Sequence, residues 1–434
     1  MTLPDSHAGH PGTSAIAALS RRAMVTLPVA AVAAGQMTSA AAQPAAAQGG
    51  GRAARTVAYV GSRTTAERAG EGKGIEVYEV GPHGTGWTLL QTVELDNPTF
   101  LAVDHTRRFL YAVHGDFTYA SAYRIDPDTG RLTALGTQET GGRNPAHLAV
   151  DPSNRFLVVA NHSSGSVATL PLRKDGSLGP VADLLSLPGE PGPHRTDQTG
   201  SKPHQVPFSP DGRFIVVPDK GLDRIFTLAL DATSGKLSLG PVPSVATREM
   251  AGPRHIAFHP RRPFAYTIDE LRSTVTVYRR TGRGALEAVQ ILSSTESTMT
   301  GDSRGGEIAV SPDGRFVYAS NRGGAGDSSP GGPEPDTLGV FAVSAGTGML
   351  RPVGWTSTEG IRPRFFCFGP DGHRLFAANE RSHTIVPFDV DRTSGTLRRT
   401  GEVVETGSPV CVLFVRLDHQ GAWLPGTRTT GRYS

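Results

Sequence analysis

A unit of about 50 residues recurs along the chain, and this repeat restricts the possible folds more than any other feature. Each copy begins with a Pro-Asp-Gly-like turn and continues with a short apolar run, as in PDGRFIVVPDK from Pro210 and PDGRFVYASNR from Pro312. The central positions of the copies are 52, 47, 58, 50, 52 and 58 residues apart, and they are Tyr59, Tyr111, Val158, Val216, Tyr266, Tyr318 and Phe376. Such a period indicates one supersecondary unit that stacks against its neighbours. The sequence therefore predicts seven copies of that unit.

A second signature follows each copy: a strand pattern, a tight turn with Gly, and an apolar residue, as in YRIDPDTGRL and FDVDRTSGTL. Each period thus contains two hairpins and four strands. The strands show apolar alternation without an amphipathic helix pattern, and 53 Gly and 33 Pro among 434 residues suit a chain with many turns. These features predict an all-β fold, a seven-bladed β-propeller with four antiparallel strands per blade.

The two ends of the repeat region complement each other. The C-terminal PVCVLFVRL, from Pro409 to Leu417, has the pattern of a first strand without a second, and TVAYVGS from Thr56 has that of a second strand without a first. Pairing the two in one blade closes the ring and removes two open sheet edges. We therefore expect one propeller domain over residues 48–420 and a C-terminal tail over residues 421–434.

The N-terminus has the pattern of a targeting segment. Arg21 and Arg22 precede a short apolar run from Val25 to Ala34, and an Ala-rich stretch follows. This order is typical of a secretory signal peptide of the twin-arginine type, so we expect signal peptide and linker over residues 1–47 and an exported protein, secreted or held in the cell envelope. An ordinary Ala-rich tail is the alternative.

Composition excludes several classes of partner. The net charge is +3, and the chain has no basic run with interleaved aromatic residues, so we expect no nucleic-acid groove. No stretch of 18 or more uncharged apolar residues occurs, so we expect no permanent membrane span. The two cysteines, Cys367 and Cys411, lie in apolar runs and are expected to be buried free thiols. We expect a monomer.

Propeller topology predicts which side chains meet. In each blade the start of the first strand and the end of the second lie on the same face, together with the loops that connect blades. Charged and imidazole groups gather at these ends, namely His147, His162, His204, Asp219, Lys220, Arg254, His255, Asp269, Glu270, Glu307, Arg322, Arg362, Arg364 and Glu380. The two longest loops, residues 192–204 and 323–337, project over the same face. Sites are commonly built on such loops, so we expect a binding site there.

Several of these segments resemble a known family. KPHQVPFSPDGRF, AGPRHIAFHPRRPFAYTIDE and PRFFCFGPDGHRLFAANE are similar to the seven-bladed propeller lactonases, which include propeller-type 6-phosphogluconolactonases and fungal carboxy-muconate cyclases. The resemblance covers residues 56–417. It implies an active site at four positions that match the cyclase branch, which are His204, Arg254, Glu270 and Arg322. The sequence departs from the family at Asp269, where Asn is frequent, and at Lys220, where Leu is frequent.

Lactone opening needs an attacking water, a stabilised oxyanion and a protonated ring oxygen. Glu270 can act as the general base, and His204 can protonate the leaving oxygen because its ordinary pKa lies near neutrality. Arg254 and Arg322 can hold the oxyanion, or an anionic group of the substrate, through forked hydrogen bonds. The expected substrate is an anionic (sugar) lactone.

Other residues on this face are expected to bind substrate, namely His194, Asp219, His255, Glu307 and Arg364. We expect no cofactor and no metal. Calcium at Asp219, Asp269 and Glu270 is the competing interpretation, but at least four arginines share the face.

Structural and non-enzymatic interpretations remain open beside the catalytic one. His147, His162 and His255 can form hydrogen bonds between blades, and Arg254 with Glu270 can be a structural ion pair. The propeller can also be a non-enzymatic surface or secreted binding module, or an intramolecular muconate-type cycloisomerase. Export argues against phosphogluconolactone, a cytoplasmic metabolite, as the natural substrate.

Overall fold

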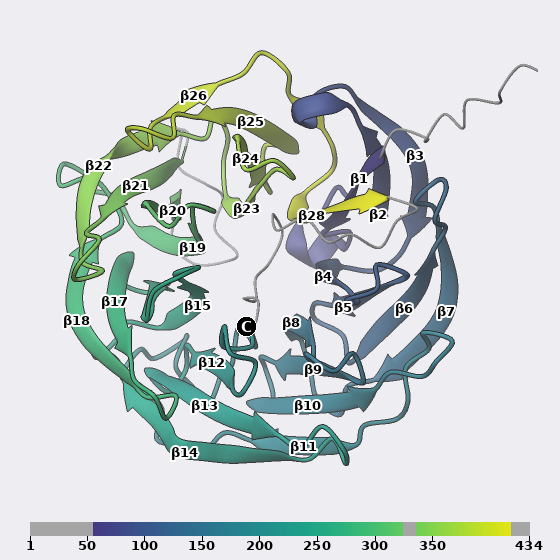
Figure 1. The fold of residues 1–434 in the computed structure, drawn as a ribbon, viewed down its shortest axis with the longest axis horizontal. Helices are drawn as coiled ribbons and strands as arrows, with labels where there is room; N and C mark the ends of the chain where they lie inside the picture. The colour runs from purple at the N-terminus through teal and green to yellow at the C-terminus, as the bar shows by residue number, and fades with distance from the viewer. Residues whose placement is uncertain (1–54, 324–335, 418–434) are drawn as a thin grey trace, which may run out of the picture. The chain divides into compact units, whose positions relative to one another are not determined.

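The computed structural model describes residues 55–323 and 336–417. The chain consists of two units, Met1–Gly51 and Arg52–Ser434. The first unit lies outside the described residues, as do the predicted signal peptide, the predicted C-terminal tail and both predicted ends of the propeller domain. In the second unit the strands form seven antiparallel sheets, which are the blades of a propeller (Figure 1). The prediction of an all-β, seven-bladed β-propeller is confirmed.

Each blade begins at the centre of the ring with its innermost strand and extends outward. The first three are β28 (Pro409–Leu417), β1 (Arg55–Ser62), β2 (Gly74–Val80) and β3 (Trp87–Glu94); β4 (Pro98–Val103), β5 (Phe109–His114), β6 (Tyr119–Ile125) and β7 (Leu132–Glu139); and β8 (Pro145–Val150), β9 (Phe156–Asn161), β10 (Ser166–Pro171) and β11 (Asp183–Ser186). The fourth contains β12 (Ile215–Asp219), β13 (Arg224–Leu230) and β14 (Leu237–Ala246).

The remaining three blades follow in chain order. They are β15 (Pro253–Phe258), β16 (Phe264–Asp269), β17 (Thr274–Arg280) and β18 (Leu286–Ser293); β19 (Ser303–Val310), β20 (Phe316–Gly323), β21 (Thr337–Val343) and β22 (Leu350–Ser357); and β23 (Pro363–Phe368), β24 (Arg374–Asn379), β25 (Thr384–Val390) and β26 (Leu397–Arg399), with β27 (Val404–Glu405) also paired to β25. The helices of the described residues are two short 3-10 turns, η1 (Ala66–Arg68) and η2 (Pro82–Gly84). No helix in this part of the chain is long and apolar enough to cross a membrane.

The ring closes through the two ends of the repeat region. β28 pairs with β1 in antiparallel register, from Arg55 opposite Leu417 to Gly61 opposite Cys411. β28 is the innermost strand of the shared blade, beside β1 in Figure 1. The predicted closure is therefore confirmed, and the first blade has no open inner edge.

The fourth blade has an irregular innermost strand. Residues 203–208 pair with β12 only through isolated bridges, Pro203 to Asp219 and Phe208 to Ile215. Pro203 and Pro207 have no N–H to donate, which prevents a continuous ladder. The N–H of His204 nevertheless donates to the carbonyl of Pro218 at 3.0 Å, which fixes the backbone of this candidate catalytic residue.

The repeated tyrosine and the repeated glycine turn hold neighbouring blades together. The buried Tyr59 donates its hydroxyl to the carbonyl of Gly130 at 2.7 Å, and Gly130 lies in the outer hairpin of the next blade. Tyr318 makes the equivalent bond to Gly395 at 2.7 Å. Both glycines have positive φ angles, 75° and 81°, which other residues adopt at a cost. Where the central residue is Tyr59, Tyr266 or Tyr318, the two sequence signatures are therefore the two partners of one contact between blades.

The two cysteines are free, as predicted. Cys411 is buried, and Cys367 is half-buried. Burial raises the pKa of the Cys411 thiol to about 12, so this thiol stays protonated and unreactive at neutral pH.

Candidate active site

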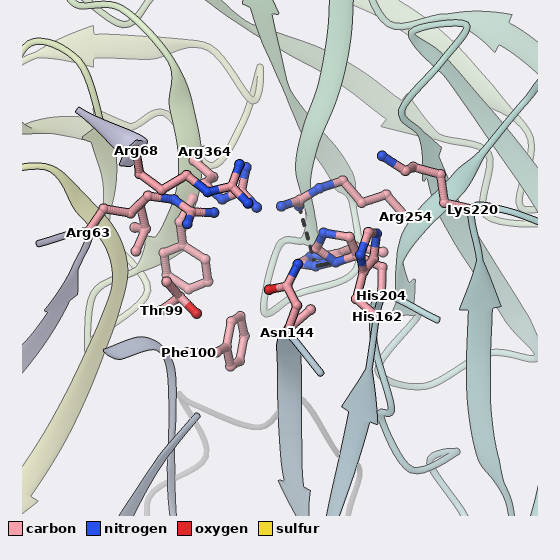
Figure 2. Close-up of a pocket in the computed structure, with 14 residues that line it drawn as sticks. Arg63, Arg68, Thr99, Phe100, Asn144, His162, His204, Lys220, Arg254 and Arg364 are labelled. Atoms are coloured by element: carbon pink, nitrogen blue, oxygen red, sulfur yellow. Dashed lines mark hydrogen bonds between the residues drawn. The ribbon is translucent and has the colours of Figure 1, made fainter. Parts of the chain in front are cut away.

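A pocket opens where the innermost strands begin (Figure 2). Its lining comes from the first residues of innermost strands and from segments that follow second strands, as the strand order predicts. The lining residues are Arg63, Arg68, Thr99, Phe100, Asn144, Ala146, His162, His204, Lys220, Arg254, His255, Arg364, Phe365 and Val410.

The lining is strongly cationic. It contains five basic side chains, and among the described residues no carboxylate lines it. In Figure 2 the guanidinium groups of Arg68 and Arg364 point toward that of Arg254 across the pocket. The lining also includes apolar groups, Phe100, Phe365 and Val410. The pocket thus combines converging positive charge with an apolar patch.

Glu270 lies behind one wall of the pocket and holds its cations in place. Its Oε1 accepts a hydrogen bond from Lys220 Nζ at 2.9 Å, and its Oε2 lies 3.1 Å from Arg254 Nε and 3.2 Å from Arg322 Nη2. Arg304 Nη1 is 3.8 Å from Oε1. The Glu270 side chain is only 3% exposed, and the residue is not part of the lining. Its carboxylate is therefore the shared counter-ion of a buried cation cluster.

Arg254 and Lys220 are the members of this cluster that line the pocket. Arg254 Nη1 donates to the carbonyl of Gly306 at 2.6 Å, so the guanidinium is held from two sides. Burial lowers the pKa of Arg254 to about 9, with further contributions from the charges of Arg364 and Arg322, whereas Glu270 opposes this shift. The site thus presents a fixed cation that a negative ligand would stabilise.

The loop over residues 192–204 carries a second carboxylate to the cluster. Asp197 lies 3.2 Å from Lys220 Nζ and 2.9 Å from Arg304 Nη1. His194 lies in the same loop, 3.5 Å from Asp197, and does not line the pocket. The other long loop, between Gly323 and Thr337, falls mostly outside the described residues.

A row of hydrogen-bonded groups runs from the pocket into the protein. His204 Nδ1 is 3.2 Å from His255 Nε2, and His255 Nδ1 is 2.8 Å from Glu307 Oε1. All three residues are buried. Burial, followed by the charge of Arg254, lowers the pKa of both imidazoles well below the usual value, and burial raises the pKa of Glu307 to about 7.

The opposite wall has its own ion pairs. Arg63 lies 3.1 Å from Asp116 Oδ2 and 3.4 Å from Glu380 Oε1, and Arg68 Nε donates to Asp116 Oδ2 at 2.8 Å. Burial lowers the pKa of Arg63 to about 10, and the nearby charge of Arg364 acts in the same direction. Both walls are therefore built alike, with cations facing the pocket and carboxylates behind them.

Known proteins share this architecture. A family model described as Lactonase, 7-bladed beta-propeller matches residues 57–414. The chain belongs to the Lactonase family. A relative named 6-phosphogluconolactonase in Bacillus subtilis (strain 168) is 34% identical over 371 residues, which cover 83% of this chain and 98% of the relative. A relative of the same name in Formosa agariphila is 30% identical over 367 residues, covering 82% and 99%.

A solved structure has the same fold. It is the Pseudomonas aeruginosa periplasmic gluconolactonase PpgL, with a TM-score of 0.75, 32% sequence identity, and coverage of 83% of this chain and 99% of that chain. The resemblance to the seven-bladed lactonases that the repeat motifs indicate is thus confirmed for nearly the whole propeller.

The lactonase fold brings most of the candidate residues together, but at different depths. His204, Arg254, His255 and Arg364 line the pocket, whereas Glu270, Arg322 and Glu307 lie behind it, and Asp219 also lies outside the lining. The Asp219 carboxylate accepts the Ser201 hydroxyl at 2.5 Å and the N–H groups of Lys202, Gly221 and Leu222. Its position is that of a turn-forming residue, and its predicted binding role stays a prediction.

In the part of the chain that the structure describes, oxygen ligands for a metal cation are not gathered at one place. Asp269 accepts the hydroxyls of Thr267, Thr274 and Thr276 at 2.7–3.0 Å, and burial raises its pKa to about 6. Within residues 55–323 and 336–417 no cluster of three or more His, Cys, Asp or Glu can hold a metal ion. The donor set beside Glu270 consists of cationic nitrogen groups, which do not fit a hard metal ion.

Two of the buried histidines connect blades, as the structural interpretation predicts. His255 on β15 bonds to Glu307 on β19, and His147 Nδ1 accepts the N–H of Val206 at 3.4 Å. His255 both connects two blades and lines the pocket. A structural role for this residue therefore does not exclude a role in binding.

Sequence reasoning missed Arg63, Arg68, Thr99 and Phe100. Arg63 and Arg68 follow β1, the second strand of the closing blade, which is the same topological position as that of Lys220 in its blade. Their position after a second strand was visible in the sequence. The first repeat, however, lacks the turn and first strand that mark the other copies, so these two arginines were not identified. Thr99 Oγ1 is buried without a hydrogen-bond partner among the described residues, so it is available to a ligand.

Proposed function

We propose that this lactonase-family propeller hydrolyses an anionic sugar lactone. The observation that carries the proposal is the lining of the pocket, with five basic side chains and no carboxylate among the described residues. A pocket of this kind favours a negatively charged ligand because the positive charges of its lining attract an anion and can form charge-assisted hydrogen bonds with it.

In this proposal the cations of the two walls bind different parts of the substrate. Arg254, fixed by Glu270 and the carbonyl of Gly306, is placed to stabilise the oxyanion that forms when water attacks the lactone carbonyl. Arg68 and Arg364 on the opposite wall are placed to bind a remote anionic group such as a phosphate or carboxylate. The apolar side chains fit the less polar face of a sugar ring.

Glu270 and Arg322 receive a different role in this proposal from the one expected from sequence. Both oxygens of Glu270 already contact cations, so a proton taken from water would remove the counter-charge of Lys220, Arg254 and Arg322. We propose that Glu270 fixes Arg254, with Arg322 as a further partner of Glu270. The general-base role of Glu270 remains a prediction, and the melting temperature of a Glu270 variant distinguishes it from this one.

The relatives narrow the choice of substrate. Two are named 6-phosphogluconolactonase, and one solved structure is named a periplasmic gluconolactonase. The cationic pocket favours the phosphorylated or another anionic lactone over the neutral one. A non-enzymatic binding module and a muconate-type cycloisomerase are the outcomes that the assay separates from hydrolysis.

The test is turnover of three compounds by the purified propeller. Glucono-lactone and its 6-phosphate are followed by acid release, and carboxy-muconate by loss of absorbance. We expect hydrolysis of the anionic lactone with a higher kcat/KM than of the neutral lactone. Rates equal to the spontaneous rates on all three would contradict the enzyme, and turnover of the muconate alone would favour the cycloisomerase.

Replacing Arg68 tests the anion-binding role, and replacing the exposed Arg279 is the matched control. Arg68→Met should raise KM for the anionic lactone about tenfold or more, since a charge-assisted hydrogen bond contributes about 1.5–3 kcal/mol, and should leave KM for the neutral lactone nearly unchanged. Arg279→Met should change neither, because Arg279 is 55% exposed and pairs at 3.8 Å with an exposed Glu287. An equal effect of Arg68→Met on both lactones would contradict an anion-binding role.

We also propose that the protein is exported and acts as a monomer. The paired Arg21 and Arg22 before an apolar run support export, and the relative from Pseudomonas aeruginosa is named periplasmic. Replacing both arginines with lysine should retain the protein inside the cell. N-terminal sequencing of exported protein should begin well after Met1, and sedimentation should give the mass of one chain.

A further inference from the structure

The row of Glu307, His255 and His204 carries an inference beyond substrate binding. The three side chains come from neighbouring blades, and their contacts are 2.8 Å and 3.2 Å long, which are hydrogen-bond distances. His204 and His255 line the pocket, whereas Glu307 does not. The row therefore connects the pocket with a buried carboxyl group.

The backbone fixes the direction of these hydrogen bonds. The N–H of Ile308 donates to Glu307 Oε1 at 2.9 Å, and the same oxygen contacts His255 Nδ1. Because this oxygen acts as an acceptor, the proton between the two side chains resides on His255 Nδ1. His255 Nε2 then carries a lone pair, which is consistent with the donor Arg254 Nη1 at 3.3 Å.

The same argument extends to His204. The lone pair of His255 Nε2 is shared between Arg254 Nη1 at 3.3 Å and His204 Nδ1 at 3.2 Å. A second lone pair on His204 Nδ1 would repel it at this distance, so we assign a proton to His204 Nδ1. A neutral His204 with a proton on Nδ1 has its lone pair on Nε2. This nitrogen makes no hydrogen bond to any of the described residues, and His204 lines the pocket. His204 thus presents a proton acceptor, and its orientation is set by Glu307 through His255.

A positive charge on either imidazole is unfavourable here. The charges of Arg254 and Arg364 face both rings, and Arg322 also faces His255, where Glu270 opposes the effect of the arginines. The carboxyl group of Glu307 also faces His255, at 2.8 Å from Nδ1. Two further imidazoles are near, His162 with its ring centre 5.4 Å from that of His204 and His147 with its ring centre 6.1 Å from that of His255. Burial and these charges hold the pKa of His204 and His255 well below the usual value. An imidazolium ion at His204 is therefore unfavourable unless His204 passes a proton to a neighbouring group.

We propose that Glu307, His255 and His204 form a proton relay in which the buried carboxylate is the final acceptor of the proton from the attacking water. The proposal rests on the hydrolase function proposed above. Water transfers a proton to His204 Nε2 as its oxygen bonds to the lactone carbonyl carbon. His204 Nδ1–H passes its proton to His255 Nε2, and His255 Nδ1–H passes its own to Glu307.

The charges balance without an imidazolium ion. The carbonyl oxygen gains one negative charge beside Arg254, Glu307 loses one, and both histidines remain neutral in the opposite tautomer. When the ring C–O bond breaks, the relay runs backward and His204 Nε2–H protonates the ring oxygen, so Glu307 is again a carboxylate. His204 is the catalytic residue of the row, and His255 and Glu307 are positioning and proton-relay residues that act through it.

The relay makes a prediction for the pH profile. Burial raises the pKa of Glu307 to about 7, and the relay needs its carboxylate form. The kcat/KM of the wild-type protein should therefore rise with pH and level off with a midpoint near 7. In Glu307→Gln the amide oxygen still accepts from His255 Nδ1 but does not take the proton. We expect kcat to fall about 10²-fold to 10⁴-fold, KM to change little, and the midpoint to disappear.

A spectroscopic measurement tests the row without activity. Nitrogen-15 NMR of the histidine-labelled full chain, with signals assigned through His204→Gln and His255→Gln, should show both rings neutral and protonated on Nδ1 at pH 8. Protonation of His204 on Nε2 would overturn the relay. This measurement uses the wild-type fold, so the test does not depend on the folding of Glu307→Gln.

The kinetic outcomes separate the relay from the proposed function. Wild-type turnover together with unchanged kcat and pH midpoint in Glu307→Gln would overturn the relay alone. Failure of the wild-type protein to hydrolyse any of the lactones would overturn the proposed function and, with it, the catalytic role of the row. Glu287→Gln is the matched control, because Glu287 is 61% exposed on β18 and should leave the profile unchanged.

Discussion

Replacing Glu270 with glutamine tests whether this carboxylate is a counter-ion or a general base. Glutamine keeps the size and one hydrogen-bond acceptor but removes the negative charge that faces Lys220, Arg254 and Arg322 at 2.9–3.2 Å. All four side chains are at most 5% exposed, so solvent does not replace the lost charge. Removing one partner of a buried ion pair destabilises a protein by about 3–5 kcal/mol.

This free energy corresponds to a measurable change in melting temperature. Unfolding entropy near the midpoint is about 2.1 cal/mol/K per residue, or roughly 0.75 kcal/mol/K for a propeller of about 360 residues. A loss of about 3–5 kcal/mol should therefore lower the melting temperature by about 4–7 °C. Calorimetry of Glu270→Gln beside Glu287→Gln measures the difference, since Glu287 makes only an exposed ion pair and should shift the melting temperature by less than about 1 °C.

Activity should fall together with stability, because Arg254 loses the partner that positions it. A variant that melts with the wild-type protein, yet loses about 10²-fold or more in kcat at every pH, would refute the counter-ion reasoning. In that case Glu270 is the base expected from the sequence, and its contacts with cations serve only to orient it.

Three other results are expected. Tyr318→Phe should cost about 1–2 kcal/mol in unfolding free energy by denaturant titration, because the carbonyl of Gly395 loses its 2.7 Å donor; no loss would contradict the role of the repeated tyrosine. Because burial raises the pKa of Glu307 to about 7, the folded state binds a proton that the unfolded chain releases, so stability from this group is lost as pH rises toward 7, and Glu307→Gln should remove that part of the loss in thermal melts from pH 5 to 8. Dialysis against EDTA should leave turnover and melting temperature unchanged, whereas strong inhibition would restore the calcium interpretation of Asp219, Asp269 and Glu270.

The repeat predicted the fold because both of its signatures correspond to physical contacts. In three copies the central residue is a tyrosine that bonds to the glycine turn of the next blade: Tyr59 to Gly130, Tyr266 to Gly348 and Tyr318 to Gly395. Closure was also readable, since an unpaired strand pattern at each end of the repeat region leaves one way to satisfy both edges. These are backbone-level constraints, and sequence periodicity reports them directly.

Whether a side chain lines the pocket or lies behind its wall could not be predicted from the sequence in the same way. Topology placed Arg254, Glu270 and Arg322 on one face, but whether a side chain points into a pocket or behind its wall depends on rotamers and on neighbours from other blades. Glu270 follows β16 as Lys220 follows β12, yet only Lys220 lines the pocket. The candidate base was therefore identified by position, whereas its contacts suggest another role.

The arrangement of charges itself argues for a ligand. Buried ion pairs add little net stability, since desolvation offsets most of their attraction, so a cluster of this size is not explained by folding alone. Glu270 and Asp197 stand behind Lys220 and Arg254, and Asp116 stands behind Arg68, so each carboxylate neutralises part of the charge without covering the side that faces the pocket. This placement offsets part of the positive charge in the folded protein while the cationic side chains still line one shared space. An anion that enters this space meets the positive charge of both walls at once, which is why we expect ligand charge, more than ligand shape, to decide binding.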